Sequence, residues 1–156
     1  MPAEPYLFFR GRCEDAIEFY KEALGAEVVI SMRFGDNPDA NAPDLPPDVA
    51  NRIMHASLKV GDATLMMSDG LSREPTNFDG FSVSLTARDA AECERWFTAL
   101  GDGGKVEMPL GKTFFAEMFG GVIDRFGLSW MIIVPADFAG PPAPIASPLP
   151  GPGRTI

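Results

Sequence analysis

Residues 5–25, PYLFFRGRCEDAIEFYKEALG, decide the fold, because residues 81–101, FSVSLTARDAAECERWFTALG, repeat their pattern. Each stretch begins with a short apolar and aromatic run, which is typical of a β-strand. Apolar side chains then recur at helical spacing, and a glycine follows that can end the helix in the left-handed conformation. The chain therefore contains two related strand–helix units.

Each unit is followed by a signal for a β-hairpin. The first half carries Val60-Gly-Asp-Ala63, and the second half carries Asp124-Arg-Phe-Gly127. Both contain Gly and Asp, which favour turns. A strand–helix–hairpin unit leaves one face of its sheet uncovered, so two such units are a natural pair. We therefore predict an α+β fold whose functional cleft lies where the two units join.

The same patterns predict the individual elements. Helices are expected from about Cys13 to Leu24 and from about Asp89 to Leu100. Residues 34–50 are rich in Pro, Asp and Asn and predict an irregular loop, and residues 71–80 link the two halves. The expected strands are residues 6–10, 26–32, 53–60, 63–68, 81–86, 106–108, 113–119 and 129–134.

We expect one folded domain at residues 1–135, made of two modules at about 5–70 and 81–135. Residues 136–156 are rich in proline and show almost no apolar periodicity. Such a segment buries too little surface to offset the entropy of ordering it. We predict a C-terminal tail that is disordered or lies extended on a neighbouring surface, which includes a partner subunit.

The composition excludes several classes of function. A net charge of −9 leaves no basic stripe to neutralise phosphates, so we expect neither nucleic acid nor an anionic membrane as a partner. No apolar run reaches the roughly 20 residues needed to span a bilayer. Cys13 and Cys93 are too few for a disulfide framework, which indicates a reducing compartment. We predict a cytoplasmic protein with both cysteines buried.

A family resemblance rests on residues 5–20, 24–26, 55–56, 66–69, 96–97 and 124–131. Together they are similar to the PhnB-like family of the glyoxalase/bleomycin-resistance/extradiol-dioxygenase group, also called the vicinal oxygen chelate superfamily. The resemblance covers about residues 5–135. It implies a glyoxalase-like fold of paired βαβββ modules whose mixed sheets curl around a cup. It also implies a homodimer.

The resemblance further implies where metal-dependent relatives hold a divalent ion. Those positions fall at Pro5 and about Leu65 in the first module, and at Phe81 and about Met131 in the second. Pro, Leu and Phe offer no donor atom, and a thioether is a soft ligand that suits hard divalent cations poorly. We therefore expect no metal. We expect no organic cofactor either, because the chain has no glycine-rich turn for a nucleotide.

Three polar residues are candidate ligand-binding residues. His55, the only histidine, could act as a base or orient a ligand, or it is a strand histidine with one hydrogen-bonded nitrogen. Asp69 either faces the rim of the cup or opens the turn into Gly70. Glu117 lies in an aromatic run and is either a pocket acid or a solvent-facing residue.

Apolar residues are expected to form the wall of the cup. Phe81, Phe115, Phe119 and Met67 are the candidates, and each is alternatively a core residue, as are Met66, Met131 and Trp130. A few polar groups within an apolar wall are what orient a small ligand. We therefore predict that His55 and Glu117 line the cup.

Two functions from different classes follow from these features. The first is a metal-independent protein that binds or sequesters a small molecule. The alternative is an enzyme of the vicinal-oxygen-chelate type, such as a lyase, isomerase or dioxygenase, with or without a metal. A collapsed cleft with a role in assembly is a third interpretation. Fold alone names neither the ligand nor a reaction.

Overall fold

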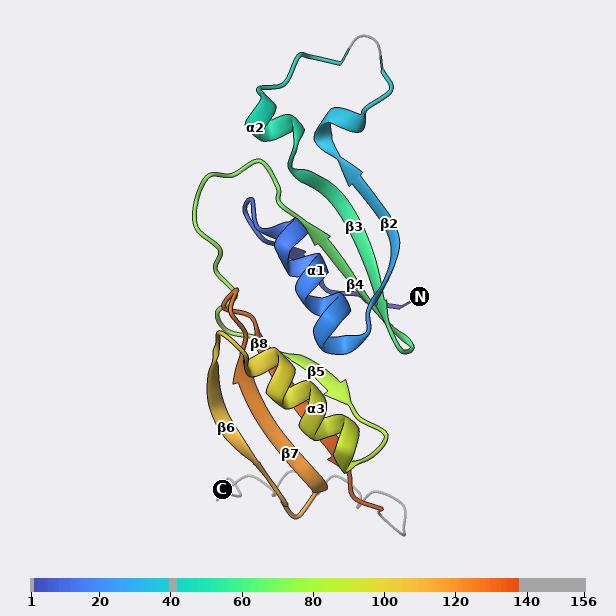
Figure 1. The fold of residues 1–156 in the computed structure, drawn as a ribbon, viewed down its shortest axis with the longest axis vertical. Helices are drawn as coiled ribbons and strands as arrows, with labels where there is room; N and C mark the ends of the chain where they lie inside the picture. The colour runs from blue at the N-terminus through green and yellow to red at the C-terminus, as the bar shows by residue number, and fades with distance from the viewer. Residues whose placement is uncertain (1, 40–41, 138–156) are drawn as a thin grey trace, which may run out of the picture.

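The computed structural model describes residues 2–39 and 42–137 and contains two four-stranded sheets (Figure 1). Each sheet carries one long helix, and both helices lie on the same side of the molecule. The tail predicted at residues 136–156 lies almost wholly outside the described residues. None of the helices in these ranges has the length and apolarity that crossing a bilayer demands.

Module one holds the first sheet. It consists of β1 (Tyr6–Phe8), α1 (Cys13–Leu24), β2 (Glu27–Arg33), β3 (Ile53–Val60) and β4 (Ala63–Ser68). The strand order is β1-β4-β3-β2, with β1 parallel to β4 and the other neighbours antiparallel. Two short turns of helix, η1 (Phe34–Asp36) and α2 (Pro47–Ala50), interrupt the loop that the sequence predicts as irregular.

Module two repeats this arrangement. It consists of β5 (Val83–Thr86), α3 (Ala90–Gly101), β6 (Lys105–Gly111), β7 (Ala116–Ile123) and β8 (Ser129–Pro135). The order is β5-β8-β7-β6, again with one parallel pair, β5 and β8. The expected pair of βαβββ modules is confirmed. The two sheets are separate and do not curl into one another within the described chain.

Helix α1 begins and ends where the sequence places its signals. Helix α3 instead runs through Gly101, the glycine expected to stop it in the left-handed conformation, and is capped by Asp102 at φ −66°. Gly25 adopts the left-handed conformation at φ 65° after α1, so its backbone N–H can close the last turn onto Lys21. The carboxylate of Asp89 accepts a hydrogen bond from the backbone N–H of Glu92 at 2.8 Å and caps α3. Cys13 and Cys93, on the buried sides of these helices, are confirmed as buried.

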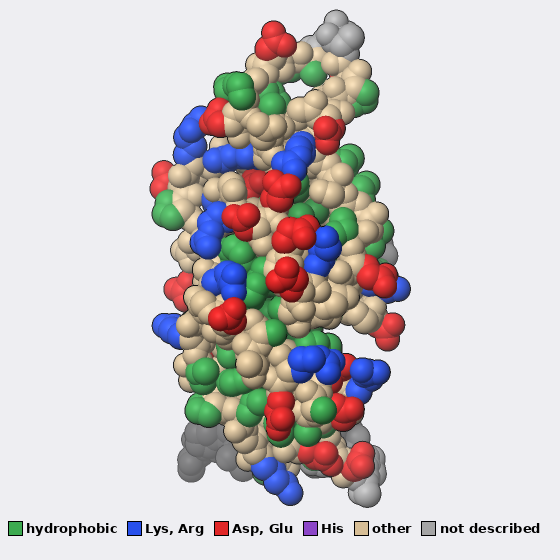
Figure 2. All heavy atoms as spheres, in the orientation of Figure 1, with side chains coloured by type: hydrophobic (Ala, Val, Ile, Leu, Met, Phe, Trp, Pro, Cys, Tyr) green, Lys and Arg blue, Asp and Glu red, His purple; other side chains and the backbone are tan. Residues whose placement is uncertain are grey.

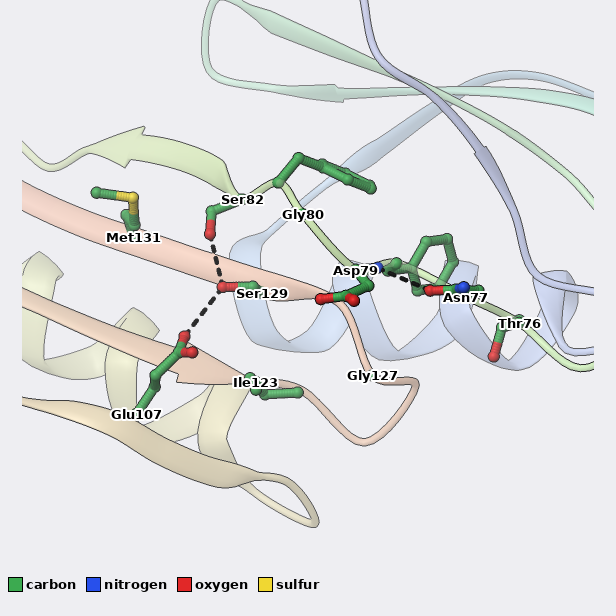
Figure 3. Close-up of a pocket in the computed structure, with 12 residues that line it drawn as sticks. Thr76, Asn77, Asp79, Gly80, Ser82, Glu107, Ile123, Gly127, Ser129 and Met131 are labelled. Atoms are coloured by element: carbon green, nitrogen blue, oxygen red, sulfur yellow. Dashed lines mark hydrogen bonds between the residues drawn. The ribbon is translucent and has the colours of Figure 1, made fainter.

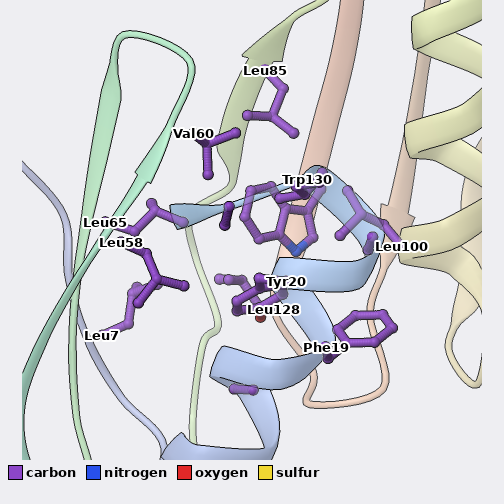
Figure 4. Packing of buried hydrophobic residues seen from close by; sticks show 14 of the residues in the cluster. Leu7, Phe19, Tyr20, Leu58, Val60, Leu65, Leu85, Leu100, Leu128 and Trp130 are labelled. Atoms are coloured by element: carbon purple, nitrogen blue, oxygen red, sulfur yellow. The ribbon is translucent and has the colours of Figure 1, made fainter. Parts of the chain in front are cut away.

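A buried carboxylate joins the two modules. Asp124, in the β7–β8 turn, is 3% exposed and accepts hydrogen bonds from the Tyr20 hydroxyl at 2.5 Å and from the Trp130 indole N–H at 2.9 Å. The backbone N–H groups of Phe126 and Leu128 bind its other oxygen. Tyr20 belongs to α1 and Trp130 to β8, which Figure 4 shows packed together. The core is therefore continuous across the modules.

The position of β7 differs from the sequence prediction of residues 113–119. Gly120 and Gly121 suggest a strand end, yet β7 continues through both. A Cβ atom at Gly120 would lie 2.8 Å from Cδ2 of Leu110 and 3.0 Å from Cε2 of Phe97. The glycine therefore serves the close approach of α3 and β6 to this strand and does not mark a turn.

Candidate functional site

Each sheet buries one face beneath its helix and leaves the other face open. Along β3, the buried residues Ala56, Leu58 and Val60 alternate with more exposed ones. In β8, Trp130 and Ile132 are fully buried while Met131 between them is exposed. We call the two uncovered surfaces the open faces of modules one and two. They are the surfaces from which a cup would be built.

A tyrosine and the single histidine meet on the open face of module one. The Tyr6 hydroxyl and His55 Nδ1 are 2.9 Å apart, and their rings lie 5.6 Å centroid to centroid. Tyr6 is 42% exposed, so the pair is accessible from solvent. The surrounding row is made of Met66, Ser57 and Ile30, which register places beside Tyr6. A ligand here would meet two polar rings within a largely apolar surface.

The expected metal positions do not carry a ligand set that fits a hard cation. Register places Tyr6 opposite Met66 and Ser84 opposite Met131 on the open faces. Leu65 is 3% exposed and lies on the buried face of β4, so it does not reach the open face. The described residues contain no group of three His, Cys, Asp or Glu side chains that could hold an ion.

The carboxylate of Asp69 is buried and binds backbone N–H groups with both oxygens, so it does not face a ligand. It is 3% exposed, and one carboxylate oxygen accepts from the backbone N–H groups of Gly11 at 2.6 Å and Cys13 at 2.9 Å. The other oxygen accepts from the N–H of Ile53 at 2.9 Å. Asp69 therefore fixes the start of α1 and of β3. This role differs from the expected turn into Gly70, where Ser68 Oγ accepts the hydrogen bond from the Gly70 N–H at 2.9 Å.

The open face of module two carries a pocket of about 590 Å³ (Figure 3). We call it the linker pocket. It is lined by residues 76–82 together with Glu107, Ile123, Gly127, Ser129 and Met131. The linker between the modules thus closes one side, and strands β6, β7 and β8 form the floor.

Three polar side chains form a chain of hydrogen bonds in the linker pocket. Ser82 Oγ and Ser129 Oγ are 2.6 Å apart, and Ser129 Oγ donates to Glu107 Oε2 at 3.1 Å. Among the candidate ligand-binding residues, Phe81, 45% exposed, lines this pocket, and so does Met131, which was an expected metal position. The sequence analysis missed Glu107, Ser82 and Ser129. Ser82 directly precedes β5 and Ser129 begins β8, and these two strands pair in parallel. A serine at the start of each strand was the signal that the sequence offered.

The remaining predicted residues lie elsewhere on the two sheets. Phe119 is on the open face of module two, opposite Ile133, and its ring lies 5.3 Å from that of Phe115. Glu117 is exposed at an irregularity between Ala116 and Met118. Within one chain, His55 is on the first sheet and Glu117 on the second, so their shared role in one cup stays a prediction.

The methionines divide between the core and the open faces. Met67 was expected in the wall of the cup, but it is fully buried on the side of β4 that faces the core. Met66 and Met131, one residue out of phase with the buried positions, lie on the open faces. Strand parity decides this difference, because successive side chains point to opposite faces.

Comparison with known proteins now places the chain. Residues 3–133 match the family described as 3-demethylubiquinone-9 3-methyltransferase. Protein YjdN of Escherichia coli K12 is 39% identical over 142 residues, which are 86% of this chain and 95% of that protein. The chain belongs to this family.

Solved structures agree with the family and its fold. Protein PA1353 from Pseudomonas aeruginosa is 42% identical with a TM-score of 0.76, over 88% of this chain and 99% of that one. A PhnB protein from Bacillus cereus is 26% identical with a TM-score of 0.68, over 86% and 99% of the two chains. The expected PhnB-like resemblance is confirmed. A glyoxylase/bleomycin resistance protein/dioxygenase domain from Frankia sp., at 13% identity and TM-score 0.60, shares the fold.

Neither cysteine of this PhnB-like chain is prepared to act as a nucleophile. Burial raises the pKa of the Cys13 thiol far above its ordinary value, and the nearby carboxylate of Asp69 raises it further. Burial also raises the pKa of the Cys93 thiol. The reactive form of cysteine is the thiolate, so both side chains are packing residues.

Proposed function

We propose that this PhnB-like protein binds or sequesters a small molecule without a metal, on the open faces of its two sheets. The observation that carries the proposal is the character of those faces. They are largely apolar and hold a few grouped polar side chains: the Tyr6–His55 pair on one sheet and the Ser82–Ser129–Glu107 chain on the other. Apolar walls with a few convergent polar groups are typical of ligand sites.

We further propose that a second copy of the chain completes the site. The helix-bearing side carries many acidic and basic side chains, spread over both modules (Figure 2). The open faces instead expose large apolar residues, which include Tyr6, Phe8, Ile30, Met108 and Met131. Large apolar side chains exposed on one side of each sheet favour association. In a two-fold dimer, module one of each copy can face module two of the other, because each face is then used once.

The family's description names a methyl transfer, which needs a methyl donor. The strand-to-helix turns that lead into α1 and α3 are Phe9–Arg12 and Ala87–Asp89. Neither is the glycine-rich turn that holds nucleotide-like cofactors at a helix N-terminus. The chain's own residues therefore do not fit that class of cofactor, and we derive no methyl transfer. Binding requires no such group.

A ligand screen read out by thermal unfolding tests the proposal. A ligand at 100 times its Kd stabilises the native state by about 2.7 kcal/mol, so hits raise the unfolding temperature. For hits that bind at module one, His55→Ala should reduce the rise in unfolding temperature. Thr98→Ala, on the exposed side of α3, is the matched control and should leave the shift unchanged. If a hit shifts wild type and His55→Ala equally, its site lies away from His55.

Light scattering tests the second copy. We expect about twice the chain mass of 16.8 kDa. Phe8→Glu places a charge on the open face of module one and should favour the monomer, whereas Thr98→Glu on the helix side should not. A wild-type protein that is monomeric at all accessible concentrations contradicts the proposed dimer. Elemental analysis that finds one tightly held divalent metal per chain would instead favour the alternative of a metal-dependent enzyme.

A further inference from the structure

We propose that the linker pocket binds an organic cation that carries N–H donors, such as a primary amine, on an apolar body. This inference rests on the proposed binding function and names the chemical class of one ligand. Three independent features of the pocket lead to it: the direction of its hydrogen bonds, the charges of its lining and the nature of its walls.

The hydrogen bonds run in one direction. A carboxylate only accepts, so the hydroxyl hydrogen of Ser129 is committed to Glu107 Oε2. Ser129 has no second hydrogen, and Ser82 must therefore be the donor in the 2.6 Å contact between the two hydroxyls. Both serine hydrogens are used, and what these three side chains still offer to a ligand is lone pairs. A group that fits them has to donate.

The charges of the lining favour a cation. Glu107 and Asp79 both line the pocket, and no lysine or arginine belongs to its described lining. Figure 3 shows Glu107 directed from β6 toward Ser129, and the Asp79 carboxylate turned to the same side of the pocket. In the described part of the chain, neither side chain forms an ion pair within 4.0 Å. An ammonium or guanidinium group would supply the missing positive charge and the donors together.

The walls accommodate an apolar body next to that head group. Phe78 and Phe81 line the pocket with their rings 6.3 Å apart and nearly perpendicular. Ile123 and Met131 complete the apolar part of the lining. An aromatic ring also attracts a cation through the negative potential of its face. The pocket volume of about 590 Å³ lies within the range of small-molecule sites.

Calorimetric titration of the full-length protein with four related probes tests the inference. The probes are 2-phenylethylamine, its N,N,N-trimethyl analogue, 2-phenylethanol and 3-phenylpropionate. They share one apolar body and differ in charge and in N–H donors. We expect the amine to bind about ten-fold or more tightly than the alcohol, because a charge-assisted hydrogen bond is stronger than a neutral one. The trimethyl analogue should be weaker than the amine, and the carboxylate weakest.

Two variants assign the effect to the pocket. Glu107→Gln removes the charge and keeps the shape, and it should weaken amine binding by about ten-fold. Glu94→Gln makes the same change of charge on the exposed surface of α3 and should alter binding less than two-fold. Thermal unfolding of both variants checks that they are folded.

The outcomes separate this inference from the proposed function. Equal affinity for the amine and the alcohol, tighter binding of the carboxylate, or an unchanged affinity in Glu107→Gln overturns the cation assignment. If none of the four probes binds, the cation assignment is also overturned for ligands with a phenylalkyl body. In each case, a hit from the wider thermal screen that depends on His55 would leave the binding function standing. If no ligand of any class is found, the proposed function fails as well.

Discussion

The substitution Asp124→Asn tests whether one buried carboxylate joins the two modules. Asp124 accepts four hydrogen bonds: from the Tyr20 hydroxyl, the Trp130 indole and two backbone N–H groups. Tyr20 and Trp130 are both fully buried, so water cannot replace a lost acceptor. Burial and the neighbouring carboxylate of Asp124 also raise the pKa of Tyr20, which keeps its hydroxyl a donor at neutral pH.

The magnitude follows from counting donors. An asparagine side chain has one oxygen and a nitrogen that only donates, so one side of the site loses its acceptor. The Tyr20 hydroxyl can turn to accept from that nitrogen, but an indole or backbone N–H cannot. At least one buried donor is left unsatisfied, which costs about 1–3 kcal/mol of the free energy of unfolding. Asp124→Ala removes all four acceptors and should cost about 3 kcal/mol or more.

Urea unfolding at one fixed protein concentration measures these costs. Tyr20→Phe removes one hydrogen-bond donor together with its need for an acceptor. It should therefore lower the free energy of unfolding by less than Asp124→Asn does. Asp102→Asn is the control, because Asp102 is an exposed carboxylate paired with Arg125 and should change stability by less than about 0.5 kcal/mol. If Asp124→Asn is as stable as the control, the carboxylate does not hold the modules together and the donor count is wrong.

Three further predictions concern other parts of the chain. The hydrogen bond from Arg88 lowers the pKa of Glu92 below its ordinary value. Wild type should therefore be more stable than Glu92→Gln above the ordinary glutamate pKa of about 4.3, and should lose this advantage as the pH falls through the lower, folded-state pKa. Unfolding measured as a function of acid pH checks this. Gly120→Ala should destabilise by about 1–3 kcal/mol in the same urea assay, because its Cβ would lie 2.8 Å from Leu110. Cys13 should react with a thiol reagent only upon unfolding, and fast labelling of the native protein would contradict its burial.

The sequence predicts the helices and the paired modules well, because their signals are local. The apolar spacing and Gly25 define α1 without reference to the rest of the chain. Strand ends are less local. β7 extends through Gly120 because α3 and β6 pack closely against it, which no window of sequence reveals.

The candidate site was less predictable because it depends on register. Register places Tyr6 opposite Met66 and so turns Leu65 into the core, a shift of one residue that reverses the face. The hydrogen bonds from Ser82 through Ser129 to Glu107 join the segment before β5 to strands β8 and β6. Strand β6 has irregular pairing on both sides of Met108. Such irregularities change which side chains point to a face, so Glu107 could not be assigned from alternation.

Asp69 shows the opposite case, in which one residue supports two interpretations of equal local merit. A carboxylate at a strand end suits both a turn and a pocket rim. Only the positions of Gly11, Cys13 and Ile53, brought together by the fold, show that both oxygens are occupied by backbone N–H groups. Polar residues at strand ends therefore need long-range contacts before they can be assigned to a site.

Native mass spectrometry of the full chain, purified without chelators, tests the central claim of a metal-independent ligand site completed by a second copy. It reports subunit number, bound metal and bound ligand in one spectrum. We predict a dimer of twice the 16.8 kDa chain mass, with no stoichiometric metal, that takes up two molecules of a ligand identified by thermal screening. A monomer that binds the same ligand fully, or one zinc, nickel, manganese or iron ion per chain, would contradict the account.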